Sequence, residues 1–483
     1  MNQPGFTPRR LVLSITALSA ALAMAVAPTA HAALPAHPVI GDIDGDGHAD
    51  LVIASANSIA VLYTGGLGRQ DIPIPGGFLS GVATADFNGD GYADVAVGDS
   101  RSNPDGGGLT SDGAVYVYYG GPSGLGAPDT LAGPAGSGDG FGDDVRAVGM
   151  NSDGFADLVV VDDDGYPEIK PRLTVLLGTA GGLSLANAVH LGRQFADAIA
   201  VGDLNGDGHA DLVVGRPYTG KTVLNDDNEV DAQEGTVAIF YGTRRGLAST
   251  AQVVHGLKAG VGYGALGTSL AIARVNGGRY ADIVAGAPTT SLDAHGHVVP
   301  KYFGAVPGAG SAVVLYGGAH GIDAQRRDVV TLASPGVPGR PYEADDFGQH
   351  VAAGDLTGDG RADVVVERDQ NYNGREGSVS VFRGTASGIT TNNAQLIGSR
   401  DLGNAHHQNY EAMLYGSALA IYHPVGARHA WLAVGAPGYI ESVSQWVGLV
   451  DLFPTTRHGV STSGGQRIIG TVDQGYFGSY LAP

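Results

Sequence analysis

The stretch Asp42-Ile43-Asp44-Gly45-Asp46-Gly47-His48-Ala49-Asp50 (DIDGDGHAD) decides the fold, because it returns along the whole chain. It recurs with few changes at residues 86–94 (DFNGDGYAD), 203–211 (DLNGDGHAD) and 355–363 (DLTGDGRAD). Three eroded copies lie at 149–157 (GMNSDGFAD), 274–282 (RVNGGRYAD) and 423–431 (HPVGARHAW). The chain therefore contains seven copies of one unit, which is the signature of a repeat fold.

The residues around each nine-residue loop keep a common spacing. Short β-type runs such as 51–53 (LVI) and 211–214 (DLVV) follow the loop, and a further run such as 113–120 (GAVYVYYG) comes later. Four short strands in each of seven units predict an all-β fold, a seven-bladed β-propeller of four-stranded antiparallel blades. Eight residues before the loop start stands a large apolar residue, usually followed by Gly: Phe78, Phe141, Phe195, Leu266, Phe347 and Tyr415.

The two ends of the repeat region complement each other. The first loop has Leu34, not an aromatic-Gly pair, eight residues before it, whereas the chain finishes with the sequence FGSYLA at 477–482. An unpaired sheet edge invites aggregation. We therefore expect the C-terminal segment to pair beside the first strand and close the ring.

These features resemble the FG-GAP repeat family, which includes the head propellers of integrin α subunits and secreted bacterial repeat proteins. Phe141-Gly142 and Phe347-Gly348 match the first half of the family name, and the GAP tripeptides at 286–288 and 435–437 match the second. The third and sixth repeats carry VDD and ERD, at 161–163 and 367–369, in place of that tripeptide. The resemblance implies adhesion through protein or carbohydrate ligands.

The four complete loops are predicted to bind about four Ca²⁺ ions. Ca²⁺ takes six to eight oxygen ligands, and each loop offers side-chain oxygens at its first, third, fifth and ninth positions and a main-chain carbonyl at its seventh. An EF-hand is excluded, because its twelfth position requires Glu, and strand-like Ile53, Val97, Val214 and Val366 stand there. The candidate ligands are Asp42, Asp44, Asp46, His48 and Asp50; Asp86, Asn88, Asp90, Tyr92 and Asp94; Asp203, Asn205, Asp207, His209 and Asp211; and Asp355, Thr357, Asp359, Arg361 and Asp363.

The eroded loops indicate a structural role for the ion. Arg274 and Gly278 replace ligands in the fifth repeat, and the seventh repeat lacks all four side-chain ligands, so neither is expected to bind. The third loop keeps Asn151, Asp153 and Asp157 but has Gly149 at its first position, which leaves its metal binding open. Because these repeats keep the strand pattern, Ca²⁺ is expected to neutralise carboxylates and stabilise a turn.

The N-terminus predicts export. Arg9-Arg10, an apolar run over 11–26 and Ala30-His31-Ala32 form a signal peptide over residues 1–32, with a mature chain over 33–483. Export by the general or the twin-arginine route, and a periplasmic or an extracellular destination, both stay open. Beyond residue 33 no apolar stretch is long enough to insert into a membrane, and the chain has no cysteine for disulfides.

The charge argues against two classes of partner. The formal net charge is −21, and removal of Arg9 and Arg10 with the signal peptide makes it −23. Nucleic acids and anionic membranes are therefore poor candidates. Four Ca²⁺ ions would bring the charge to about −15.

Three common catalytic motifs are absent from the sequence, so we expect a binding module and no enzyme. No G-x-S-x-G, S-x-x-K or H-E-x-x-H occurs, and His406-His407, His295 and His297 are interpreted as solvated loop residues. The alternative is a secreted, hydrolase-like enzyme with its site in the central channel.

Loop lengths indicate where a ligand binds. The acidic loops have a fixed length, whereas the connections at the opposite strand ends vary, which places recognition on the face away from the metal loops. These connections span 216–234, 288–309, 368–376, 398–414 and 438–447. The aromatic candidates for recognition are Tyr218, Tyr302, Phe303, Tyr342, Tyr372, Tyr410, Tyr439 and Trp446.

Overall fold

The computed structural model divides the chain into two units, residues 1–37 and the compact unit Pro38–Pro483. The expected signal peptide lies outside the described residues. These are residues 41–483 apart from 103–111, 134–139, 152, 163–171, 194–197, 220–221, 225–229, 245, 257–263, 300–305, 369–376, 404–412, 443–444 and 472–474.

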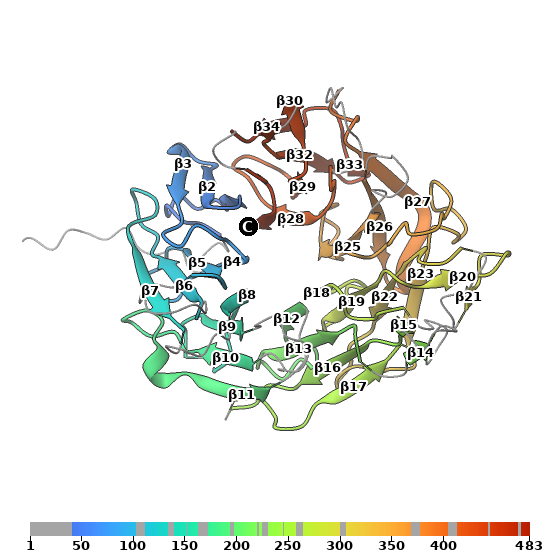
Figure 1. Cartoon of the computed structure of the whole chain (residues 1–483), viewed down its shortest axis with the longest axis horizontal. Coiled ribbons are helices and arrows are strands. Elements are labelled where there is room, and N and C mark those ends of the chain that lie inside the picture. The colour runs from blue at the N-terminus through green and yellow to red at the C-terminus, as the bar shows by residue number, and fades with distance from the viewer. Residues whose placement is uncertain are drawn as a thin grey trace, which may run out of the picture. The chain divides into compact units, whose positions relative to one another are not determined.

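The described part of unit 38–483 is a seven-bladed β-propeller, as expected (Figure 1). Each blade has four antiparallel strands in sequence order from the centre outwards, except that the inner strand of the first blade comes from the chain's end. The only helix in this part of the chain is the 3₁₀ turn η1 (Leu185–Asn187), and none is long and apolar enough to cross a membrane.

The strands have the following bounds. The first blade contains β35 (Tyr480–Ala482), β1 (Leu51–Ala54), β2 (Ser58–Tyr63) and β3 (Gly68–Pro73). The second contains β4 (Gly81–Ala85), β5 (Asp94–Asp99), β6 (Ala114–Tyr118) and β7 (Pro128–Ala132). The third contains β8 (Phe141–Val148), β9 (Asp157–Asp162), β10 (Arg172–Leu176) and β11 (Val189–Arg193). The fourth contains β12 (Ala198–Gly202), β13 (Asp211–Arg216), β16 (Thr236–Phe240) and β17 (Gln252–His255).

The remaining blades follow the same order. The fifth contains β18 (Leu270–Ala273), β19 (Asp282–Ala287), β22 (Ser311–Leu315) and β23 (Arg327–Val330). The sixth contains β24 (Val351–Gly354), β25 (Asp363–Arg368), β26 (Ser378–Thr385) and β27 (Gly388–Gly398). The seventh contains β28 (Ala418–Tyr422), β29 (Trp431–Ala436), β32 (Leu449–Thr456) and β34 (Gln466–Ile469), and the short β33 (Gly459–Val460) also pairs with β32. Three hairpins extend the second-to-third strand connections: β14 (Thr222–Leu224) with β15 (Val230–Gln233), β20 (Ser291–Leu292) with β21 (Val298–Val299), and β30 (Ile440–Ser442) with β31 (Gln445–Trp446).

The C-terminal segment closes the first blade, as the sequence predicted. Strand β35 pairs antiparallel with β1, with Ala482 opposite Val52 and Tyr480 opposite Ala54. The amide of Gly478 also donates to the Ala54 carbonyl at 2.8 Å. The strand expected at the edge of the first blade is thereby paired on its inner side.

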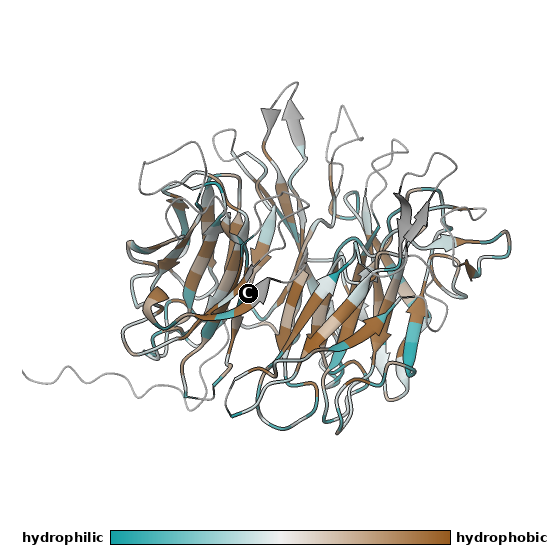
Figure 2. Ribbon diagram, turned by 60° about the horizontal axis from the view of Figure 1, so that its bottom comes forward, coloured by the Kyte–Doolittle hydropathy of each residue, from teal (hydrophilic) through white to brown (hydrophobic). Residues whose placement is uncertain are grey.

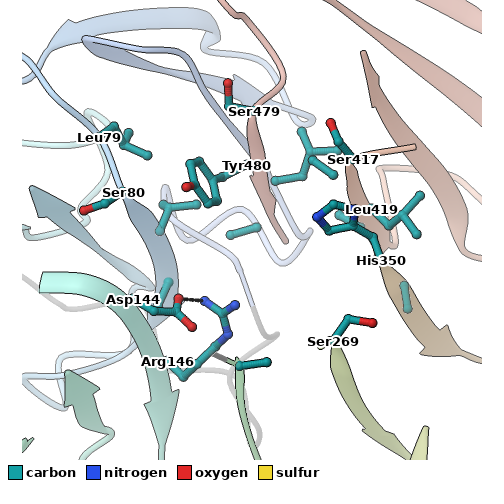
Figure 3. Close-up of a pocket in the computed structure, with 18 of the residues that line it drawn as sticks. Leu79, Ser80, Asp144, Arg146, Ser269, His350, Ser417, Leu419, Ser479 and Tyr480 are labelled. Atoms are coloured by element: carbon teal, nitrogen blue, oxygen red, sulfur yellow. Dashed lines mark hydrogen bonds and ion pairs between the residues drawn. The ribbon is translucent and has the colours of Figure 1, made fainter. Parts of the chain in front are cut away.

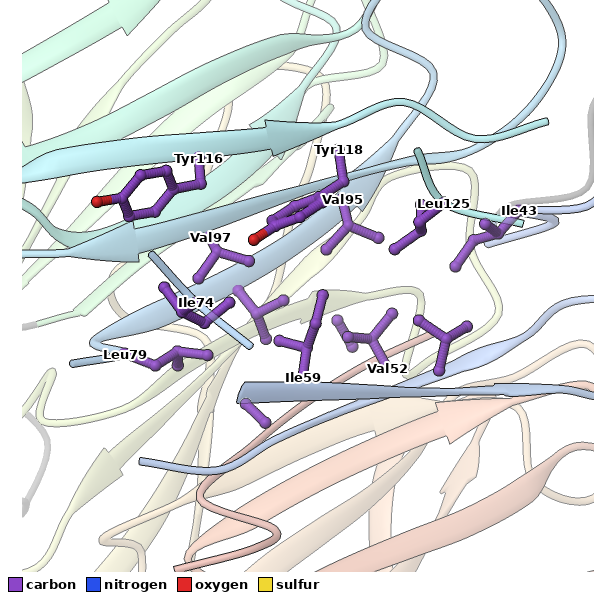
Figure 4. Packing of buried hydrophobic residues seen from close by; sticks show 14 of the residues in the cluster. Ile43, Val52, Ile59, Ile74, Leu79, Val95, Val97, Tyr116, Tyr118 and Leu125 are labelled. Atoms are coloured by element: carbon purple, nitrogen blue, oxygen red, sulfur yellow. The ribbon is translucent and has the colours of Figure 1, made fainter. Parts of the chain in front are cut away.

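Hydrophobic cores lie between neighbouring blades. Val52 and Ile59 of the first blade pack against Val95 and Tyr118 of the second, and all four side chains are fully buried (Figure 4). Because a middle strand packs against a blade on each side, it reads as a near-continuous apolar run, and Figure 2 shows the hydrophobic residues gathered in the strands. Each fully buried Val or Leu contributes about 1.5–3 kcal/mol.

The aromatic-Gly pair has a steric explanation. Phe347 is fully buried, and Gly348 has a φ of +102°. A Cβ on Gly348 would lie 2.4 Å from the Ser311 carbonyl oxygen, so the position requires glycine on both counts. The second repeat has no glycine after Phe78. There Leu79 is the buried residue, and Phe78 is half-buried beneath the Arg101 guanidinium, which lies 4.0 Å from its ring centre.

Tyrosine hydroxyls connect adjacent blades near the outer turns. The Tyr241 hydroxyl donates to Gln252 Oε1 at 2.5 Å and accepts from the Ile322 amide of the next blade at 2.8 Å. Tyr63 repeats this arrangement with Gln70 and Leu125. The outer turns at Gly124-Leu125 and Gly321-Ile322 therefore present an amide to the preceding blade.

Candidate metal loops, central channel and variable face

Each acidic loop leads into the second strand of its blade, and the loops lie at one end of the propeller. Neighbouring loops touch, since the Ala93 amide donates to the Asp42 carbonyl at 2.7 Å and the Ala156 amide to the Asp86 carbonyl at 2.9 Å. Each of the first two loops is therefore joined to the loop of the next blade. The antiparallel strands place the second-to-third strand connections at the opposite end.

The first-position carboxylate organises each complete loop. In the first loop, Asp42 Oδ1 accepts from the Gly45 amide and Oδ2 from the Gly47 amide, both at 2.8 Å. Asp86, Asp203 and Asp355 accept the corresponding pair of amides in their own loops, at 2.6–2.9 Å. The first-position aspartate of each complete loop thus gives all four loops the same bend.

The first loop concentrates negative charge. Carboxylate oxygens of Asp42, Asp44 and Asp46 lie within 4.8 Å of one another. Burial raises the pKa of Asp42 and of Asp44, and repulsion from Asp46 adds to the increase. Hard carboxylate oxygens are the ligands that Ca²⁺ prefers, and a bound cation would offset this repulsion. The donor set therefore fits Ca²⁺.

Other expected ligands differ in their surroundings. Asn88 Oδ1 and Asn205 Oδ1 accept the amide two residues ahead at 2.9 Å. Thr357 is 2% exposed, and its Oγ1 has no hydrogen-bond partner within the described residues. An oxygen ligand with this burial gains a partner if a cation binds.

The ninth-position aspartate has a role that the metal hypothesis missed. Asp211 is fully buried, and its two oxygens accept from the Leu204 amide at 2.8 Å and the Gly242 amide at 2.7 Å. Asp282, in a loop expected to be empty, accepts from the Val275 and Gly317 amides at 2.9 Å each. The same side chain therefore ties the loop to the outer turn even where the metal ligand set is incomplete. Its persistence in the eroded loops of the third and fifth repeats was the available signal.

Burial raises the pKa of this aspartate in every complete loop. The value is about 7 for Asp50 and Asp94 and about 6 for Asp211 and Asp363, with desolvation as the largest cause. The hydrogen bonds that each carboxylate accepts from backbone amides act in the opposite direction and lower the pKa. The remaining lone pairs of a carboxylate leave room for a cation.

A cavity of about 930 Å³ occupies the centre of the propeller. The inner strands line it, and Figure 3 shows an ion pair between Asp144 and Arg146 on its wall. Two serines that line the cavity form structural hydrogen bonds. Ser80 Oγ donates to the Gly142 carbonyl at 2.7 Å, and Ser269 Oγ donates to the Gly348 carbonyl at 3.0 Å.

The sixth repeat places a histidine in this channel. His350 Nδ1 lies 2.5 Å from Glu367 Oε2, and the histidine side chain is 42% exposed, whereas the glutamate is 2% exposed. Glu367 is the first residue of the divergent ERD tripeptide. The second, Arg368, forms a buried ion pair with Asp345 at 2.9 Å. In the sixth repeat, the first two residues that replace the GAP tripeptide therefore each form a polar contact, Glu367 with His350 and Arg368 with Asp345.

The aromatic candidates of the variable face fall into four groups. Tyr218 is 67% exposed, whereas Tyr439 is 5% exposed and belongs to a core, so its proposed contact role was wrong. Tyr342 is half-buried, with the guanidinium groups of Arg340 and Arg368 5.0 and 5.6 Å from its ring centre. Outside the described residues, or without a described side chain, are Tyr302, Phe303, Tyr372, Tyr410 and Trp446.

Two family models match the repeats. The FG-GAP-like repeat model matches residues 42–97 and 149–214. The FG-GAP repeat model matches residues 78–118, 195–240 and 347–382. These segments contain the four complete loops and the strands that flank them.

Several curated proteins are similar to parts of the chain. Human integrin alpha-IIb is 31% identical over 153 residues, which are 29% of this chain and 14% of that protein. Integrin alpha pat-2 of Caenorhabditis elegans is 29% identical over 205 residues, 38% of this chain and 15% of the relative. Mouse phosphatidylinositol-glycan-specific phospholipase D is 33% identical over 106 residues, 17% of this chain and 12% of the enzyme. The matches thus span a small part of each relative's length.

Proposed function

The chain belongs to the FG-GAP repeat family, and from this premise we propose that it is an exported, Ca²⁺-stabilised binding module. Its acidic loops hold the ions on one face, and its variable connections bind a protein or carbohydrate ligand on the other. The similarity to integrin α subunits supports recognition of a ligand outside the cytoplasm.

The observation that carries this proposal is the asymmetry between the two faces. The complete loops share one length and one hydrogen-bond pattern, which suits a structural role. The opposite connections of the fourth, fifth and seventh blades contain additional hairpins. Variable loops on a rigid scaffold are the usual place for recognition.

Calcium is assigned to the loops around Asp42, Asp86, Asp203 and Asp355. The ions would neutralise carboxylates that the fold brings together, and their binding would add to folding stability. They take no part in ligand contact, because the variable connections leave from the other strand ends. Export to a calcium-rich compartment agrees with this need.

A protein and glycan array probed with the mature chain, in Ca²⁺ and in chelator, tests the proposal. Once a ligand is identified, Tyr218→Ala should weaken binding at least about tenfold without lowering the melting temperature, since Tyr218 is 67% exposed. The matched control is Leu67→Ala, which alters a residue that is 49% exposed on the turn between β2 and β3, at the acidic-loop end. Equal losses from both variants, or no ligand on any array, would contradict the proposal.

A second candidate is an enzyme with its site in the channel. The observation in its favour is the His350–Glu367 pair, in which a buried carboxylate orients an accessible imidazole as a general base requires. The similarity to a phospholipase D concerns 17% of this chain. Hydrolysis of an ester or phosphodiester substrate that is abolished by His350→Ala and kept by Tyr218→Ala would favour this candidate over the binding module.

A further inference from the structure

A second kind of ligand cluster lies in the fifth blade, away from the acidic loops. Asp293, His295 and His297 stand in the turn between β20 and β21, within the connection from β19 to β22. One potential ligand atom from each residue lies within 4.8 Å of the other two. The two histidine side chains are 81% and 78% exposed.

We propose that Asp293, His295 and His297 form a binding site for one transition-metal ion of the Zn²⁺ class. Imidazole nitrogens together with a carboxylate suit Zn²⁺, Cu²⁺ or Ni²⁺, whereas Ca²⁺ selects oxygen donors. The site is thus chemically distinct from the loops proposed for Ca²⁺.

The backbone organises the cluster before any ion binds. Asp293 Oδ1 accepts the amides of His295 and His297 at 2.8 and 2.9 Å, which fixes the carboxylate within the turn. The Asp293 amide also donates to the His297 carbonyl at 2.9 Å and closes the hairpin. These contacts leave the second oxygen, Oδ2, directed toward the imidazoles.

The base of the hairpin is anchored to the blade. Leu292 is fully buried, and it exchanges two backbone hydrogen bonds with Val306, both at 3.1 Å. Gly296 at the tip has a φ of +82°, and a Cβ there would lie 2.7 Å from Ala333 Cβ. The turn that carries the histidines is therefore anchored at its base, and its tip lies against Ala333.

The distance from Asp293 to His297 agrees with tetrahedral coordination, and the distance to His295 is longer. Zn²⁺ bonds of 2.0–2.2 Å place neighbouring ligand atoms roughly 3.3 Å apart. Asp293 Oδ2 lies 3.2 Å from His297 Nδ1 and 4.0 Å from His295 Nδ1, and the two rings are stacked with centres 6.1 Å apart. Small side-chain rotations would complete the geometry.

Three protein ligands leave one tetrahedral position for water or for a donor atom of a partner. The hairpin belongs to a second-to-third strand connection, so this position would open on the face with the variable loops. An ion held there could bridge the chain to a carboxylate or imidazole of a bound protein. The site itself does not depend on the identity of that ligand.

Calorimetric titration of the mature, tag-free chain with Zn²⁺, in excess Ca²⁺, tests the proposal. The unmodified protein should bind one Zn²⁺ more tightly than any further ion. His297→Ala should weaken that site at least about tenfold, and combined His295→Ala and His297→Ala should abolish it. The control His320→Ala, which removes another exposed histidine, should leave it unchanged. Visible absorption of the Co²⁺-loaded protein should show tetrahedral bands that the double variant lacks.

Two results would overturn the inference. One is an unchanged Zn²⁺ stoichiometry in the double variant, because the ion would then bind elsewhere. The other is loss of the signal when Ca²⁺ is raised, because the cluster would then not discriminate against hard cations. Melting curves without Zn²⁺ should coincide for all variants, since both histidine side chains are largely exposed.

Discussion

The ring of Tyr92 lies over Gly45 of the preceding blade, so closely that a Cβ on Gly45 would be 2.4 Å from Tyr92 Cε1. Tyr92 is the seventh residue of its loop, a position expected to contribute only a carbonyl. Its side chain instead joins one acidic loop to the next. The same relationship recurs between Phe155 and Gly89, Tyr280 and Gly206, Arg361 and Gly277, and His429 and Gly358.

Gly45→Ala should destabilise the protein by roughly 1–3 kcal/mol, because alanine is strained at a φ of +76° and its methyl group collides with Tyr92. Gly47→Ala is the matched control, since φ there is +87° but nothing lies within 4 Å of the added Cβ. Gly47→Ala should therefore lose only the stability that a positive φ costs an alanine. Thermal unfolding in Ca²⁺ measures both variants.

A double-mutant cycle isolates the contact between the blades. Adding Tyr92→Ala to Gly45→Ala should cost less than the sum of the single losses, because the collision is then absent. Strict additivity of the two changes would contradict the assigned packing.

Tyr241→Phe should lower stability by about 1–3 kcal/mol. The change leaves the Ile322 amide without its acceptor and Gln252 Oε1 without its donor, while it keeps the ring in place. Chemical denaturation measures the loss. Tyr218→Phe is the control, because that side chain is 67% exposed, and it should change the unfolding midpoint little.

Asp282→Asn separates the structural role of the ninth position from metal binding. An amide group has a single acceptor oxygen, so either the Val275 or the Gly317 amide loses its partner, at about 1–3 kcal/mol. The melting temperature should fall equally in Ca²⁺ and in chelator. The melting temperature of Asp211→Asn should instead fall further in Ca²⁺ than in chelator, because this change also removes a negative charge from an ion site. Identical calcium dependence for the two variants would contradict the distinction.

The sequence was sufficient for the fold because the repeat spacing specifies every blade. Phe477-Gly478 even indicated the closing strand, now seen in the pairing of Ala482 with Val52. The spacing alone did not show that Leu79, and not Phe78, is the buried residue of the second repeat.

Contacts between repeats were less accessible from the sequence. The side chain of Tyr92 and the second role of Asp211 depend on a neighbouring blade or turn, and a motif read within one repeat does not contain that information. His295 and His297 were interpreted as solvated loop residues, since their common direction toward Asp293 depends on the closed hairpin. Tyr439 was misassigned because a loop aromatic and a core aromatic look alike in sequence.

Chelation provides the strongest test of the acidic loops. If four sites bind Ca²⁺ only in the folded state, free Ca²⁺ at 100 times Kd stabilises the fold by about 2.7 kcal/mol per site. The melting temperature should therefore fall when chelator is added. The first loop should contribute, because three of its carboxylates lie within 4.8 Å of one another and their repulsion returns when the ion leaves.

The combined change Asp203→Ala and Asn205→Ala localises that effect. It removes the first and third ligands of one loop, so the variant should lose about 2.7 kcal/mol more in Ca²⁺ than in chelator. Some loss should remain in chelator, because Asp203 also accepts the Gly206 and Gly208 amides at 2.7 and 2.9 Å. Arg274→Ala changes the first position of a loop with no ligand set, and its calcium dependence should equal that of the unmodified protein. A melting temperature indifferent to chelator would remove calcium from the proposed function, whereas the hydrogen bonds of Asp203 and Asp211 would still account for the shape of the loop.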